Sequence, residues 1–127
     1  MWREVARATV VVAVLASSAC DKNVGEPEPA PAHDAVGVRG QSVYDLRCAP
    51  CHGTDGGGDG PAAVAITPKP RNFRDPTFWN GRTAEQLRLV VKQGKAGTLM
   101  PPFEGILSDA EIADVVAYVQ HFRAAGS

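Results

Sequence analysis

Two cysteines and a histidine lie close together in the segment Cys48-Ala49-Pro50-Cys51-His52. On a helix, residues three and four positions apart share one face, so both thiols and the imidazole can reach the same side. Two thiols at this spacing can add to the vinyl groups of a haem, and the adjacent imidazole can then ligate its iron. The spacing therefore predicts one haem c held covalently by Cys48 and Cys51, with His52 as an axial ligand of the iron.

Two other chemistries use the same residue types. A thioredoxin-type redox pair is found in a βαβ context, and a zinc site needs a further pair of cysteines or histidines. The sequence has no cysteine after Cys51, and its only later histidine is His121. Haem attachment is therefore favoured over both alternatives.

The second axial ligand decides between an electron carrier and a catalyst, because two protein ligands leave no position on the iron for a substrate. Met100 is the only methionine besides the initiator, and Pro101 and Pro102 follow it in a loop. His121 is a rival, but it falls opposite the apolar face of the C-terminal helix, and His33 lies in a Pro-rich segment. We therefore expect Met100 to ligate the iron; filling a gap in the core is its alternative role.

The N-terminal residues 1–19 have the layout of a secretory signal. A basic start is followed by the apolar run Ala8–Ala16, which is shorter than a bilayer-spanning helix, and then by small residues. The segment Leu15–Cys20 resembles the lipobox of bacterial lipoproteins, which implies cleavage before Cys20 and its lipidation. Ordinary cleavage after Ala19, leaving Cys20 as a thiol, is the alternative. Either route predicts export to the periplasmic side of a bacterial membrane, and lipidation would anchor the chain to it.

A Pro-rich segment, residues 20–37, separates this signal from the rest of the chain. Its proline content and lack of large apolar residues predict a flexible, extended tether. Residues 38–127 are then expected to form one small domain. A formal charge of −1 and a pI of about 6.3 give no general attraction for nucleic acid, so we expect no such partner.

Local signals in this domain favour helices. A short helix is predicted over residues 38–47, whereas the glycines and prolines of residues 53–70 predict a loop. Two capping-box patterns, Thr83–Gln86 and Ser108–Glu111, open a helix that ends near Gln93 and a longer C-terminal helix that reaches Phe122. Sustained alternation of apolar and polar residues is missing, so the fold class is predicted to be all-α.

These features together resemble a class I cytochrome c over residues 38–122, through Gly40, Tyr44, the Cys48–His52 motif, Gly60-Pro61, Met100-Pro101 and Tyr118. The resemblance implies three to four helices and long loops around one covalent haem. It implies that the first and last helices cross near Gly40, with Tyr44 and Tyr118 in contact.

The resemblance also implies roles for individual residues around the haem. The carbonyl of Pro61 would accept a hydrogen bond from the outer nitrogen of His52 and so orient its ring. Arg71, Asn72 and Trp79 would lie near the haem propionates; the alternatives are a solvated Arg71 and a Trp79 that is only part of the core.

The function implied is reversible one-electron transfer between respiratory redox partners, such as a reductase and an oxidase, and not enzymatic catalysis. Seven cationic side chains and two carboxylates lie between Lys69 and Lys95, so an acidic docking surface on a partner would be attracted if the cations cluster beside the haem. Two other functions stay open: a haem catalyst or gas sensor with a labile or absent Met100 ligand, and a haem-bearing subunit of a larger complex.

Overall fold

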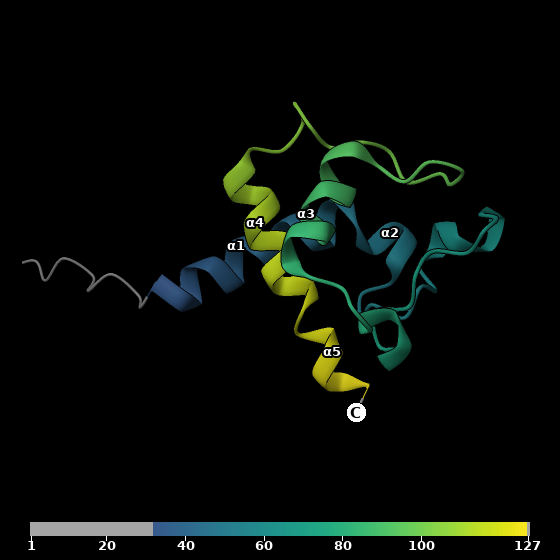
Figure 1. The fold of residues 1–127 in the computed structure, drawn as a ribbon, viewed down its shortest axis with the longest axis horizontal. Helices are drawn as coiled ribbons and strands as arrows, with labels where there is room; N and C mark the ends of the chain where they lie inside the picture. The colour runs from purple at the N-terminus through teal and green to yellow at the C-terminus, as the bar shows by residue number, and fades with distance from the viewer. Residues whose placement is uncertain (1–31, 127) are drawn as a thin grey trace, which may run out of the picture.

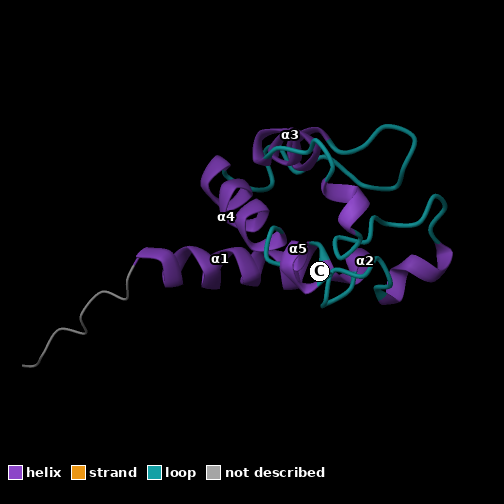
Figure 2. Cartoon of the chain, turned by 60° about the horizontal axis from the view of Figure 1, so that its bottom comes forward, coloured by secondary structure: helices purple, strands orange, loops and turns teal. Residues whose placement is uncertain are grey.

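The computed structural model describes residues 32–126. The predicted signal, Cys20 and most of the predicted tether lie outside the described residues. Within residues 32–126 the chain forms helices joined by long loops and contains no strand, as Figure 2 shows. The all-α prediction is therefore confirmed for this part of the chain. None of its helices is long and apolar enough to cross a membrane.

Helix α1 (Ala32–Arg47) packs against α4 (Asp109–Val119), and the two cross in Figure 1. The crossing point is Gly40, where an added Cβ would collide with the backbone oxygen of Asp114. Tyr44 and Tyr118 meet beside it with ring centroids 5.4 Å apart. The predicted helix crossing at Gly40 is thus confirmed, and it requires a glycine because the two backbones touch there.

The first helix begins at Ala32 rather than near Val38, within the segment assigned to the tether. Its predicted start was therefore too late. The early turns have few large apolar residues, so periodicity could not reveal them. Arg39 extends from this helix to the buried Asp114, with 2.8 Å between Nε and Oδ2.

Both predicted capping boxes are confirmed. Helix α3 (Ala84–Gln93) begins after Thr83, which exchanges hydrogen bonds with Gln86. Helix α4 begins after Ser108, whose backbone N–H donates to Glu111 Oε2 at 2.8 Å. Each box satisfies N–H groups that a helix start leaves unpaired.

The C-terminal helix differs from the prediction because it is interrupted. Helix α4 ends at Val119, and a separate short helix, α5 (Phe122–Ala125), carries Phe122. Between them the N–H of His121 donates to the oxygen of Tyr118, three residues back, which tightens the turn. The backbone stays in the right-handed helical region at Gln120 and His121. Phe122 therefore still lies over the core, with its ring centroid 5.2 Å from that of Tyr44.

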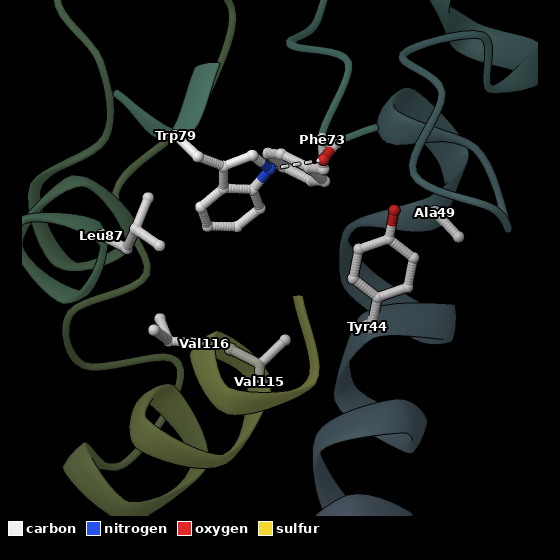
Figure 3. Close-up of a cluster of buried hydrophobic side chains, with 7 residues drawn as sticks. All are labelled: Tyr44, Ala49, Phe73, Trp79, Leu87, Val115 and Val116. Atoms are coloured by element: carbon white, nitrogen blue, oxygen red, sulfur yellow. Dashed lines mark hydrogen bonds between the residues drawn. The ribbon is translucent and has the colours of Figure 1, made fainter. Parts of the chain in front are cut away.

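The buried core lies between these helices and the central loop, as Figure 3 shows. It consists of Tyr44, Ala49, Phe73, Trp79, Leu87, Val115 and Val116. Trp79 ends a short 3-10 helix, η2 (Pro76–Trp79), and its indole N–H donates to the oxygen of Phe73 at 2.7 Å. This bond satisfies a buried donor and ties two parts of the central loop to each other.

Candidate haem-binding site

The cysteine motif forms a short helix, α2 (Ala49–His52), directly after α1. The N–H of Cys48 still bonds to the oxygen of Tyr44 at 2.8 Å. Pro50 has no N–H with which to continue the ladder, so α1 ends at Arg47 and the chain turns. The turn brings the side chains of Cys48, Cys51 and His52 to one cavity, as their spacing predicted.

This cavity has a volume of about 320 Å³. Its apolar wall comes from α3, α4 and the loops, and includes Leu87, Val90, Val91, Val115, Val116, Val119 and Phe103. Burial raises the pKa of the Cys48 thiol to about 11, and the neighbouring Cys51 adds a smaller increase. The thiol of Cys48 is therefore protonated at neutral pH before any attachment.

Met100 reaches the same cavity from the loop between α3 and α4. Its backbone oxygen accepts from the N–H of Lys95 at 3.2 Å, and its own N–H donates to Thr98 Oγ1 at 3.2 Å. Further along, the N–H of Phe103 donates to the oxygen of Val91 in α3 at 3.0 Å. The loop that carries Met100 is thus bonded within itself at Lys95 and Thr98, and to α3 through Phe103.

The rival histidines have other positions. His121 lies at the start of α5, where its ring is 6.0 Å from that of Tyr118, and it does not line the cavity among the described residues. The side chain of His33 lies outside the described part of the structure. Of the described side chains, His52 and Met100 are therefore the imidazole and the thioether that reach the cavity together.

The outer nitrogen of His52 has a different partner from the one that the resemblance implied. His52 Nδ1 lies 3.1 Å from the backbone oxygen of Arg71, not at Pro61. Pro61 is exposed and opens a 3-10 helix, η1 (Pro61–Ala65). Burial lowers the pKa of His52, and the bond to the Arg71 oxygen opposes that shift. The neutral imidazole that a metal needs is thus favoured.

The three residues that the resemblance places near the haem propionates lie in different surroundings. Arg71 lines the cavity. Asn72 instead accepts from the N–H of Arg74 at 2.8 Å, in a local turn. Trp79 is buried in the core with its N–H used by Phe73, so the core alternative describes its position. Of the three, Arg71 is the one placed to meet a carboxylate in the cavity.

The cationic residues divide into two groups. Arg47, Lys69, Arg71, Arg82 and Lys95 line the cavity, and no acidic residue in the described range does so. Outside it, Arg88 pairs with Glu85 at 3.2 Å and Lys92 with Asp109 at 2.7 Å. Sequence reasoning missed Arg47, although its position four residues before Cys51 on a helical path could have indicated it.

These residues fit a haem. Apolar walls suit the macrocycle, two thiols suit its vinyl groups, and an imidazole with a thioether suits its iron. The cations of the cavity suit two carboxylates, which would otherwise be costly to desolvate. Each of these features comes from a different segment of the chain, and the fold brings them to one place.

Comparisons with known proteins agree with this chemistry. The family model described as Cytochrome c matches residues 37–123. Cytochrome c-555 of Prosthecochloris aestuarii is 30% identical over 93 residues, which cover 65% of this chain and 83% of that protein.

A chain from the reducing HAO-like protein complex of Kuenenia stuttgartiensis has a similar structure, with a TM-score of 0.58 and 33% identity. The match covers 66% of this chain and 41% of the solved one, so the present chain spans less than half of it. Since the family model matches well over half of its residues, this chain belongs to the cytochrome c family, as a class I member that binds haem c covalently.

Proposed function

We propose that this chain is an electron carrier whose haem iron is ligated by His52 and Met100, and that it is not an enzyme. The observation that carries the proposal is the shared cavity of His52, Met100 and both cysteines. Bound haem c supplies an iron that alternates between Fe(III) and Fe(II), one electron at a time. The relationship to cytochrome c-555 supports the same function.

The Met100 loop supports a carrier over a catalyst. A substrate could bind to the iron only if Met100 left its position. The N–H groups of Lys95 and Phe103 donate hydrogen bonds that hold the loop, and Thr98 Oγ1 accepts one from the N–H of Met100. A thioether ligand also favours the reduced state more than a second imidazole would. Burial lowers the pKa of His52, which favours the neutral imidazole that can act as a ligand.

A second proposal is that the chain serves as a haem-bearing subunit of a larger redox complex. Its support is the structural similarity to one chain of a reducing HAO-like protein complex. The match covers 41% of that solved chain. Purification of the native protein under mild conditions distinguishes the two. A carrier is expected alone, whereas a subunit is expected with stoichiometric partners.

We further propose that the protein is exported and anchored by a lipid on Cys20. The support is the signal pattern of residues 1–19 and the lipobox-like Leu15–Cys20. The Pro-rich residues that follow would let the domain reach redox partners at the same membrane. Mass spectrometry of the native protein tests this proposal, since an unmodified Cys20 or an uncleaved N-terminus would contradict it.

Absorption spectra of the native protein in both oxidation states test the ligation. The oxidised protein is expected to show the weak sulfur-to-iron band at the red end of the visible spectrum. Met100→Ala is expected to lose the band, and Leu99→Ala to keep it, because Leu99 lines the same cavity but has no thioether. A wild-type protein without the band, with high-spin iron that readily binds carbon monoxide, would favour catalysis or gas sensing instead.

A further inference from the structure

The ring of His52 is held by a segment that lies about twenty residues further along the chain. Arg71 provides the backbone oxygen 3.1 Å from Nδ1. Phe73 stacks on the imidazole, with ring centroids 4.5 Å apart and planes inclined by 18°. One short stretch, residues 71–73, therefore contacts both the edge and the face of the ring.

A glycine loop, residues 56–58, holds this stretch in place. The N–H of Phe73 donates to the oxygen of Gly56 at 2.7 Å, and the N–H of Gly58 donates to the oxygen of His52 at 2.7 Å. The loop is thus bonded on one side to the backbone of His52 and on the other to Phe73. It connects the two segments that must meet at the imidazole.

Gly58 is the point of closest approach. Its φ of +76° is a conformation that side chains disfavour. A Cβ at this position would lie 2.6 Å from the oxygen of Pro70 and 3.3 Å from that of Arg71. Any larger residue would therefore push away the backbone that supplies the acceptor for Nδ1.

We propose that Gly58 is a positioning residue for the axial imidazole: its missing side chain lets the Arg71 oxygen accept a hydrogen bond from the Nδ1–H of His52. The inference rests on the proposed function, in which His52 ligates the iron. A carbonyl can only accept, so this bond keeps the proton on Nδ1 and leaves the lone pair of Nε2 for the metal. It also increases the electron donation of the ring, which stabilises the oxidised iron.

The test compares Gly58→Ala with Gly105→Ala in the haem-loaded protein. Gly105 has nearly the same φ, +79°, but an added Cβ there meets nothing within 4 Å. Both variants carry the same backbone strain, and only Gly58→Ala displaces residues 70–71. We expect the midpoint potential to shift upward in Gly58→Ala and to stay at the wild-type value in Gly105→Ala.

Nuclear magnetic resonance of the reduced protein gives a second readout. The Nδ1 proton of His52 is expected to exchange slowly with solvent in the wild type and faster in Gly58→Ala. An unchanged potential together with an unchanged exchange rate in Gly58→Ala would overturn the proposal. If that variant does not fold, the wild type decides, because an Nδ1 proton that exchanges as fast as in an unfolded chain would overturn it too.

The outcomes separate this inference from the proposed function. If the red-end band is present and lost in Met100→Ala, the ligation stands, whatever Gly58→Ala does. If the wild type lacks the band, the ligation by His52 and Met100 fails on its own evidence. The Nδ1 exchange rate then still reports whether the Arg71 oxygen holds the ring.

Discussion

The hydroxyl of Tyr44 donates a hydrogen bond to the backbone oxygen of Gly53 at 2.7 Å. Gly53 follows His52 directly, so the bond ties the end of the haem-attachment helix to the core face of α1. Tyr44 is fully buried beside Tyr118 and Phe122. A single phenol therefore links the crossing of α1 and α4 to the segment that carries the axial histidine.

Stability at alkaline pH is expected to depend on Tyr44. Burial raises the pKa of this phenol above its ordinary value of 10, with smaller contributions from Cys48 and Tyr118. The folded state thus keeps the proton that the unfolded chain loses above about pH 10. The resulting stabilisation is complete below that pH and is lost as the pH rises further. Denaturant unfolding from pH 8 upward, followed by circular dichroism, should show this decline above about pH 10.

Tyr44→Phe should flatten the alkaline decline and lower the free energy of unfolding at neutral pH by about 1 to 3 kcal/mol, because the Gly53 oxygen loses its donor. Tyr118→Phe is the matched control: its pKa is also raised by burial, but the ring is only partly buried. An equal alkaline decline in wild type and Tyr44→Phe would contradict the assignment.

Substitution of Gly40 tests the helix crossing. Glycine to alanine inside a helix normally stabilises by about 1 kcal/mol through helix propensity. At Gly40 the new Cβ would collide with the Asp114 oxygen, and such overpacking costs about 1 to 3 kcal/mol. We expect Gly40→Ala to lower the free energy of unfolding, measured with denaturant.

Gly37→Ala supplies the control within the same helix. An added Cβ at Gly37 meets nothing within 4 Å, so propensity alone should act and stabilise the protein. Equal effects of the two substitutions would mean that α1 and α4 do not touch at Gly40.

The parts of the fold that were predicted correctly have local signals. Thr83 and Ser108 predict the starts of α3 and α4, because a capping box depends only on residues three positions apart. The cysteine motif is likewise local, so its five consecutive residues are enough to place the attachment segment. Met100 is a candidate ligand because it is the only methionine besides the initiator, and it lines the same cavity as His52. Its ligation of the iron stays a prediction.

The remaining features depend on contacts between distant segments. His52 lies 19 positions before Arg71, and nothing in the sequence between them indicates that the two meet. The position implied for Pro61 came from resemblance, which could not take account of the 3-10 helix that Pro61 opens here. Trp79 fits either the core or the cavity by residue type, and only its bond to Phe73 decides.

The cap of α4 is expected to contribute to stability. Ser108 Oγ accepts from the N–H of Glu111 at 3.2 Å, and its own N–H donates to that carboxylate. Ser108→Ala should lower the free energy of unfolding by about 0.5 to 2 kcal/mol. Ser42→Ala is the control, because Ser42 lies inside α1 and its hydroxyl donates a hydrogen bond to the backbone oxygen of Val38 in the same helix. This variant should change the free energy of unfolding by less than about 0.5 kcal/mol. Equal losses in both variants would argue against the cap.

The last prediction concerns electron exchange at the cavity. Among the described residues, every charged side chain that lines the cavity is cationic. An anionic reductant should therefore be attracted to it, although the whole chain has a formal charge of −1. Ferrocyanide should therefore reduce the protein faster at low than at high ionic strength. Lys95→Glu should slow the reaction by roughly threefold to tenfold at low salt, since reversing one nearby charge changes the interaction by about 1 kcal/mol.

Arg74→Glu makes the same change in net charge at an exposed position that does not line the cavity, and it should have the smaller effect. Hexaammineruthenium(II), a cationic reductant, should show the opposite salt dependence, because the same field repels it. If Lys95→Glu and Arg74→Glu slow ferrocyanide equally, net charge alone governs the approach. The cations around the cavity would then not select an acidic partner, because their position would not matter.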